Sequence, residues 1–256
     1  MQVEGKAAIV TGGGTGVGRE TALLLARRGY HVAINYSRSK REAEATGHEV
    51  ESTGVRSVVV QADVADDAAC RRLVKQAVDQ LGRLDVLVNN AGTTQFIRHS
   101  DLDSVSSEAW QRIFAVNVIG PFQCARAAKG ALTTARGQII NVASTAGINA
   151  VGSSIPYCAS KAALINMTMS LARVLAPDVR VNAVAPGFIT GRWLQNGLGP
   201  AYERVKAAAE SRVPLGRVCD PLDVAKAILG LIEGSDLVTG QTLVCDGGMT
   251  LGSSEL

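Results

Sequence analysis

Aromatic residues are scarce in this 256-residue chain, at 4% of the sequence, although hydrophobic residues in total reach 46%. Val, Ile, Leu and Ala must therefore fill the core, which is typical of a buried parallel sheet covered by helices. No apolar stretch approaches the roughly 18 residues of a membrane-spanning helix. The first residues also lack the apolar segment of a signal peptide, so we expect a cytoplasmic protein.

Cysteine and histidine are also sparse, with five and three residues. The cysteines form no Cys-x-x-Cys pair, which favours reduced thiols packed as small hydrophobic groups. The histidines, His31, His48 and His99, are too dispersed to suggest a catalytic triad or a metal site, and no metal is expected. The net charge is only +3, and no basic run is interleaved with aromatic residues. We therefore expect no nucleic-acid partner.

Apolar runs alternate with helix-period segments along the whole chain. Expected strands cover residues 7–11, 31–36, 55–62, 84–89, 137–143, 180–185 and 242–245. Expected helices cover residues 17–28, 40–52, 66–81, part of 110–132, 157–175 and 221–232. This alternation predicts an α/β fold of the Rossmann type, a doubly wound parallel sheet with helices on both faces. No linker or repeat interrupts it, so residues 1–256 are expected to form a single dinucleotide-binding and catalytic domain.

Residues 188–214 are the least regular stretch of the sequence. They carry Gly191, Gly197, Gly199 and Pro200. A long irregular segment in a compact fold is usually functional, so we expect a substrate loop here. Trp193 and Leu194 are candidates for an apolar lid.

The first expected strand leads directly into a glycine-rich loop, Thr11-Gly12-Gly13-Gly14-Thr15-Gly16-Val17-Gly18. Glycines permit a tight turn and a close backbone approach to a phosphate, and the following helix points its amides at that phosphate. Glycines could serve the turn alone, but the strand–loop–helix context favours dinucleotide binding. The expected contacts are Gly12, Gly14, Thr15, Gly16, Val17 and Gly18.

The end of the second strand bears on the choice between NADP and NAD. NAD-selective sites usually place an acidic residue near this point, about 20 residues past the loop, to hold the ribose 2′-hydroxyl. No acid occurs from Asn35 to Lys40. Ser37 and Arg38 instead offer donors that suit a 2′-phosphate, with Lys40 as a further candidate. NADP(H) is favoured and NAD(H) stays open, since Arg38 could equally be a solvated residue at a helix start.

Two further strand ends carry candidate cofactor contacts. Asp63, followed by Val64, could accept the adenine amino group or cap the next helix. Asn90, Ala91 and Gly92 are small enough to let a cofactor lie against the sheet, although Asn and Gly also suit a plain turn.

Tyr157 and Lys161 are four residues apart, which places them on one helix face one turn apart. A phenol normally titrates near ~10, but a neighbouring ammonium lowers the pKa toward the range of a general acid or base. Ser144 precedes them and lacks the Gly-x-Ser-x-Gly context of a hydrolase nucleophile. On spacing alone, a surface tyrosine beside a solvated lysine stays an alternative.

Together these segments resemble the short-chain dehydrogenase/reductase family over nearly the whole chain. The matching positions occur in the family's order and spacing: the glycine-rich loop, Asp63-Val64, Asn89-Asn90-Ala91-Gly92, Asn117, Ser144, Tyr157, Lys161 and Pro186-Gly187. The resemblance implies that Ser144 polarises a substrate carbonyl and that Tyr157 transfers the proton. Lys161 would lower the pKa of the phenol and bind the nicotinamide ribose.

The resemblance also implies that Asn117 holds a water connecting Lys161 to solvent, and that Pro186, Gly187 and Ile189 line the nicotinamide. Two departures from the family pattern stand out. Thr15 replaces the basic residue that NADP-preferring members often carry in the loop. Gly191 occupies the place where a threonine commonly follows the Pro-Gly-x-Ile segment, so a contact to the pyrophosphate or carboxamide is shifted or lost.

The expected function is an NAD(P)(H)-dependent oxidoreductase that transfers hydride between nicotinamide and a carbonyl or secondary alcohol. A 3-oxoacyl thioester or small ketone is the favoured substrate, by resemblance to 3-oxoacyl-acyl-carrier-protein reductases. The alternatives are a sugar or polyol dehydrogenase and, from another class, a non-catalytic dinucleotide sensor. The expected substrate walls are residues 93–97, 145–155 and 188–198. The basic residues that could meet an acidic carrier are Arg126, Lys129 and Arg173, and the resemblance implies a homotetramer through 110–132 and 157–175.

Overall fold

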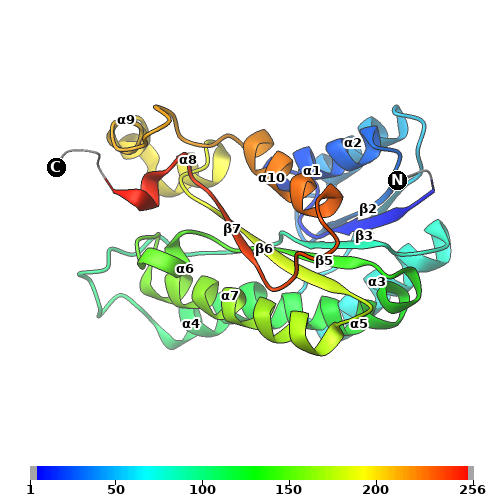
Figure 1. Ribbon diagram of the computed structural model, residues 1–256. Helices are drawn as coiled ribbons and strands as arrows, with labels where there is room; N and C mark the ends of the chain where they lie inside the picture. The colour runs from blue at the N-terminus through cyan, green and yellow to red at the C-terminus, as the bar shows by residue number, and fades with distance from the viewer. Residues whose placement is uncertain (1–4, 253–256) are drawn as a thin grey trace.

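The computed structural model describes residues 5–252. Its centre is a parallel sheet of seven strands in the order β3-β2-β1-β4-β5-β6-β7 (Figure 1). The strands are β1 (Ala7–Val10), β2 (His31–Tyr36), β3 (Ser57–Gln61), β4 (Val86–Asn89), β5 (Gln138–Val142), β6 (Arg180–Pro186) and β7 (Thr242–Cys245). The winding reverses between β1 and β4, so the predicted doubly wound sheet is confirmed.

Helices cover both faces of the sheet (Figure 1). One face carries α1 (Gly16–Arg27), α2 (Lys40–Glu51) and α10 (Pro221–Glu233). The other carries α3 (Asp67–Leu81), α4 (Ser107–Phe114), α5 (Gly120–Ala135) and α7 (Ile155–Leu175). Within residues 5–252, no helix combines the length and the apolar character needed to cross a membrane.

The period of two along each strand divides the core into two layers. In β1, Ala7 and Ile9 pack toward α3 and α5, whereas Ala8 and Val10 pack toward α1, α2 and α10. All four side chains are fully buried, as expected for a strand covered on both faces. The five cysteines are free, and four of them are buried as small apolar groups.

The long helix expected within residues 110–132 is interrupted. Residues Ala115–Ile119 form a π-helical turn, η1, between α4 and α5. Such a turn inserts one extra residue into the helical repeat and often marks a functional site. It contains Asn117, which is fully buried.

The segment 188–214 is more regular than the sequence predicts. It folds into α8 (Arg192–Leu198), a 3-10 turn η2 (Gly199–Ala201) and α9 (Tyr202–Glu210). Gly191, with φ 129°, begins α8, and Gly199, with φ 52°, ends it. These glycines mark helix ends, so the prediction of a largely irregular stretch is wrong. Two further short elements, α6 (Ala146–Asn149) and η3 (Met249–Leu251), also escape the sequence pattern.

The carboxyl ends of the strands meet on the side of the molecule where α6 and α8 lie, at the left of Figure 1. Segments far apart in the sequence therefore converge there, as in other open parallel α/β sheets. This edge of the sheet positions the candidate site.

Candidate active site

A cavity of about 640 Å³ opens at the carboxyl edge of the sheet. It is lined from the glycine-rich loop, the ends of β2, β4, β5 and β6, helix α7 and the start of α8. Of the residues that the sequence singles out as catalytic or cofactor-binding, all line this cavity except Gly14, Gly18, Asn117 and the further candidate Lys40. The structure thus brings together groups separated by up to 177 positions, from Gly12 to Ile189.

The glycine-rich loop is held by the residues that follow β4. The Asn90 side chain donates from Nδ2 to Thr11 O and Gly12 O, at 2.9 and 3.1 Å. The Thr11 hydroxyl in turn accepts from the backbone N–H groups of Asn90 and Ala91. These contacts fix the loop before any ligand enters, so the amides at the start of α1 are preorganised toward the cavity.

Gly14 and Gly18 shape the loop from behind the cavity wall. A Cβ atom at Gly18 would lie 2.2 Å from Gly12 O and 2.6 Å from Asn90 Nδ2. A Cβ atom at Gly14 would lie 2.8 Å from Ala43 N, where α2 packs against the loop. Glycine is required at both positions by backbone packing, and neither residue reaches the cavity surface.

The groups at the ends of β2 and β3 form one end of the cavity. Ser37 and Arg38 are exposed there, and Arg38 has no hydrogen-bonded or ionic partner among the described residues. Lys40 does not line the cavity, and its Nζ lies 3.6 Å from Glu44. The structure therefore keeps Arg38 and removes Lys40 from the candidate phosphate-binding groups.

Asp63 is already engaged at this end of the cavity. Its carboxylate accepts from Ala65 N at 3.0 Å and pairs with Arg112 Nη2 at 3.0 Å. Burial acts to raise the pKa of Asp63, but the Ala65 N–H and the Arg112 guanidinium outweigh it and hold the pKa below its ordinary value. The carboxylate is thus ionised at neutral pH and can accept a further donor.

Ser144, Tyr157 and Lys161 meet at the other end, beyond β5 and on the first turns of α7. The Ser144 hydroxyl accepts from Ala146 N at 3.1 Å. The Lys161 ammonium donates to Val142 O at 2.8 Å and lies 5.6 Å from the centroid of the Tyr157 ring. Lys161 is only 5% exposed, so its charge is held inside the protein by one carbonyl and the face of the phenol.

The pKa values of this group differ from the expectation of an acidic phenol. Burial raises the pKa of Tyr157 to about 12, against the opposing effect of a hydrogen bond with Ser144. Burial also lowers the pKa of Lys161 to about 8. The pKa of Tyr157 is therefore raised and not lowered as the sequence predicts, because burial disfavours the phenolate. At neutral pH Tyr157 is a protonated phenol, able to donate a proton.

Asn117 lies behind the cavity and joins three segments. Its side chain accepts from Thr93 N at 2.9 Å and donates to Thr93 O at 3.0 Å. It also donates to Ser160 Oγ at 3.0 Å, and that hydroxyl donates to Tyr157 O at 2.7 Å. The side-chain oxygen and NH2 group of Asn117 thus link the π-helical turn to the chain after β4 and to α7. The water-holding role that the resemblance implies for Asn117 stays a prediction.

The three expected substrate walls converge around Ser144 and Tyr157. Thr94 Oγ1 and Ser153 Oγ lie 2.6 Å apart, and Ile97 N donates to Ser153 O at 2.9 Å. The Phe96 ring packs so closely against α8 that a Cβ atom at Gly197 would lie 2.0 Å from it. Trp193 is 46% exposed, and its ring lies close to Gly92.

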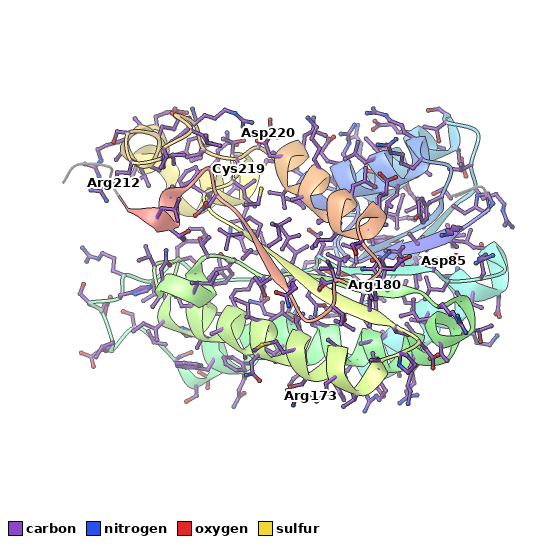
Figure 2. All side chains as sticks on the ribbon, in the orientation of Figure 1. Asp85, Arg173, Arg180, Arg212, Cys219 and Asp220 are labelled. Atoms are coloured by element: carbon purple, nitrogen blue, oxygen red, sulfur yellow. The ribbon has the colours of Figure 1, made fainter. Side chains whose placement is uncertain are left out.

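The basic residues proposed for a carrier, Arg126, Lys129 and Arg173, are not among the residues that line the cavity. Arg126 pairs with Asp67 at 2.5 Å and packs over the Phe122 ring. Arg173 is sixteen residues beyond Tyr157 on α7, about 24 Å along the helix axis, and Figure 2 shows it at the lower edge of the molecule. Arg212, by contrast, lies beside α9 on the substrate side (Figure 2). The carrier-docking role of Arg126, Lys129 and Arg173 stays a prediction.

Residues 5–252 contain no group of three or more His, Cys, Asp or Glu side chains that could hold a metal ion.

Known proteins are similar to this chain in sequence and in structure. Residues 12–250 match the family model described as enoyl-(acyl carrier protein) reductase. A protein of Streptomyces violaceoruber, named as a ketoacyl reductase of the granaticin polyketide synthase, is 43% identical over 97% of both chains. The 3-oxoacyl-[acyl-carrier-protein] reductase FabG of Staphylococcus aureus is 39% identical over 95% of this chain and 98% of its own.

Solved structures give the same result. A short-chain type dehydrogenase/reductase from Mycobacterium marinum superposes with a TM-score of 0.87 at 32% identity, covering 97% of each chain. The chain belongs to the short-chain dehydrogenase/reductase family. An NAD⁺-bound xylitol dehydrogenase also superposes with a TM-score of 0.87, at 30% identity over 97% of this chain and all of its own. The protein is thus an oxidoreductase that transfers hydride between a nicotinamide cofactor and a carbonyl or alcohol carbon.

The cavity of this short-chain dehydrogenase/reductase fits a nicotinamide dinucleotide. A Cβ atom at Gly12 would lie 3.2 Å from Ala91 Cα, so the loop leaves no room for a side chain there. The start of α1 faces the middle of the cavity, with Arg38 at one end and Lys161 at the other. An elongated anion with its phosphates near the helix start is the ligand that these groups suit.

Three residues of the site are not predicted from the sequence. Arg112 holds Asp63, Asn35 accepts from Gly12 N at 3.2 Å, and Arg192 lines the cavity from α8. Asn35 carries the one usable signal, since a polar residue at the end of a buried strand needs a partner. Arg112 and Arg192 depend on how α4 and α8 fold back over the sheet, which no local motif specifies.

Proposed function

We propose that this enzyme uses NADPH to reduce the carbonyl group of a 3-oxoacyl thioester or a small ketone. The observation that carries the proposal is the protonated phenol of Tyr157 beside Ser144 in a cavity built for a dinucleotide. A general acid for carbonyl reduction must hold its proton at neutral pH and release it to a developing alkoxide. A phenol with a pKa near 12 keeps its proton at neutral pH. The alkoxide is a stronger base than the phenolate, so it takes the proton from the phenol.

The bound nicotinamide supplies hydride to the carbonyl carbon. Ser144 and Tyr157 donate hydrogen bonds to the carbonyl oxygen and orient it, and the same donors stabilise the negative charge that develops there. Tyr157 then releases its proton to that oxygen. Lys161 is charged below about pH 8, and its charge beside the ring stabilises the phenolate left behind.

The mouth of the cavity favours an apolar acyl group over a polyol. Trp193 and Leu194 line it, Phe96 packs against α8, and Ile148 and Val151 of the expected wall 145–155 are 51% and 73% exposed. A polyol would need several hydrogen-bonding side chains at this place, because unpaired hydroxyls are costly to bury. The names of the ketoacyl reductase relatives support the same substrate class.

A panel of substrates tests the proposal. With NADPH as donor, we expect reduction of acetoacetyl thioesters with a kcat/KM at least tenfold above that for simple sugars and polyols in either direction, as the apolar mouth implies. The measurement is the loss of NADPH absorbance under initial-rate conditions. Oxidation of xylitol or related polyols as the fastest reaction would assign the enzyme to the alternative class. Dinucleotide binding without turnover of any carbonyl or alcohol would support a sensor.

Arg38 is expected to determine the preference for NADPH. The substitution Arg38→Gln removes the unpaired guanidinium at the adenosine end, so the dissociation constant for NADPH should rise about tenfold, as for the loss of one charge-assisted hydrogen bond. The dissociation constant for NADH should change less than about twofold. Lys40→Gln is the matched control, because Lys40 lies outside the cavity. Equal weakening of both dinucleotides by Arg38→Gln would contradict the assignment.

We also propose that copies of the chain associate through α5 and α7. Ile119 at the end of η1, Phe122 on α5, and Met169 and Val174 on α7 are between 42% and 70% exposed. Exposed large apolar side chains on adjacent helices are typical of protein–protein interfaces. A homotetramer built through these helices would leave the mouth of the cavity open.

A further inference from the structure

An ion pair links the substrate side of the cavity to the cofactor side. Arg192, the first residue of α8, lies with Nη1 at 3.2 Å from Glu42 Oε1, in the first turn of α2. The two residues are 150 positions apart in sequence. No other ion pair among the described residues connects α8 to the glycine-loop side of the cavity. The contact therefore holds α8 over the start of α1.

Arg192 borders two hollows at once. It lines the large cavity and also a smaller one of about 280 Å³, whose walls include Gly14, Thr15 and Gly16. Its guanidinium therefore lies between the first turns of α2 and the amides at the start of α1. This is the part of the fold where the phosphates of a dinucleotide are held.

Among the other cations that line the two cavities, Arg38 is unpaired but lies at the adenosine end, and the rest are engaged elsewhere. Arg19 pairs with both Glu20 and Glu49. Arg112 is bound to Asp63, and Lys161 donates to Val142 O at the far end of the cavity. Arg192 has one contact, and its side chain is 64% exposed. It is thus the cation best able to exchange its partner for a phosphate group.

The backbone on both sides of Arg192 permits such an exchange. Gly191 has a φ of 129° and no atom within 4 Å of a Cβ position, and Gly199 at the other end of α8 has a φ of 52° and is equally open. Glycine adopts these conformations without strain, so α8 is bounded by two points at which the chain can rotate. Gly191 and its neighbour Thr190 both line the large cavity.

We propose that Arg192 is a cofactor-binding residue that leaves Glu42 and pairs with the diphosphate of the bound dinucleotide. Glu42 is then a competitor that holds the guanidinium near its target. The exchange couples dinucleotide binding to the position of α8, which carries Trp193 and Leu194 into the substrate side of the cavity. The inference rests on the nicotinamide-dependent activity of the family and not on the choice of carbonyl substrate.

Binding measurements without any carbonyl substrate test this role. The chain has two tryptophans, so Trp110→Phe leaves Trp193 as the sole fluorescent reporter beside the cavity. In that background, Arg192→Gln should raise the dissociation constants of NADPH, NADH and ADP by the same factor, about tenfold. The dissociation constant of AMP, which lacks the second phosphate of the diphosphate, should change much less. Glu42→Gln should lower the dissociation constants of NADPH, NADH and ADP, because it removes the competing carboxylate.

Two variants serve as controls. Arg192→Lys keeps the charge and should restore part of the affinity, whereas Arg38→Gln should weaken NADPH alone. A circular-dichroism melt of each variant checks that the fold is retained, as expected for exposed side chains. Kd values for NADH and ADP that Arg192→Gln leaves within twofold of the parent would overturn the proposal.

Two other outcomes would also overturn it. Weakening of NADPH alone would assign Arg192 to the 2′-phosphate. Weakening by Glu42→Gln to the same extent as by Arg192→Gln would show that the pair is a fixed structural link and not an exchange. None of these results depends on which carbonyl compound the enzyme reduces, so the failure of one proposal is distinguishable from that of the other.

Discussion

Replacing Tyr157 with Phe is expected to lower kcat by about a thousandfold or more, the range that general acid catalysis and a lost oxyanion donor together supply. The phenol is the one protonated acid in the cavity that adjoins Ser144. The ring that remains still fills the cavity wall and still faces the Lys161 ammonium. The dissociation constant for NADPH, measured by fluorescence, should therefore stay within about twofold of the parent value.

Tyr30→Phe is the matched control for this change. Burial also raises the pKa of Tyr30 to about 12, helped by the nearby charges of Asp85 and Glu233. Tyr30 is 2% exposed and lies outside the cavity, so its loss should leave kcat unchanged. A parallel loss of NADPH binding and turnover in Tyr157→Phe would instead indicate a damaged fold.

Replacing Lys161 with Met is expected to remove most of the activity and to change how stability depends on pH. Burial lowers the pKa of Lys161 from 10.5 to about 8. Between these values the unfolded chain binds the proton and the native chain does not, so the free energy of unfolding rises with pH. Below pH 8 both states are protonated, and the cost of the buried charge is constant.

The parent protein should therefore gain about 2 kcal/mol of stability relative to Lys161→Met between pH 8 and pH 10. Urea denaturation at both pH values measures the difference, and pH 10 stays below the range in which Tyr157 titrates. Lys129→Met, which removes an exposed lysine of α5, should follow the parent at both values. The kcat of Lys161→Met should fall about a hundredfold or more, because the phenolate loses its stabilising charge. A stability difference that is independent of pH would contradict the assigned desolvation of Lys161.

Much of the fold follows from local patterns in the sequence. The strands β2 and β7 have the predicted bounds, and the others differ by a few residues at their ends. Gly82, in the left-handed region with φ 87°, ends α3 where the sequence predicts. Such features are predictable because they depend on side-chain alternation and on the conformational preferences of single residues. The same patterns identify the residues that converge at the cavity, since parallel strands present their carboxyl ends at one edge.

The rest depends on three-dimensional packing. No distinctive amino-acid composition marks the π-helical turn at Ala115–Ile119. The hydrogen bonds of Asn117 to Thr93 and Ser160 account for the turn, and they can be recognised only in the folded structure. The pKa values of Tyr157 and Lys161 are set by their burial, which sequence spacing does not reveal. Arg192 meets Glu42 only because α8 folds back across the cavity. Helix period and motif spacing carry no information on these contacts.

The hydrogen bonds of Asn117 bear on how such an enzyme can diverge. Both backbone polar groups of Thr93 are bonded to that one amide, which also reaches Ser160 beneath the proton donor. Mutations that reshaped this wall would displace Tyr157 as well, so selection is expected to hold it nearly constant. The opposite wall, bounded by Gly191 and Gly199, has no such tie to the acid. New substrate preferences are therefore expected to arise from one side of the cleft, while the chemistry on the other is inherited unchanged.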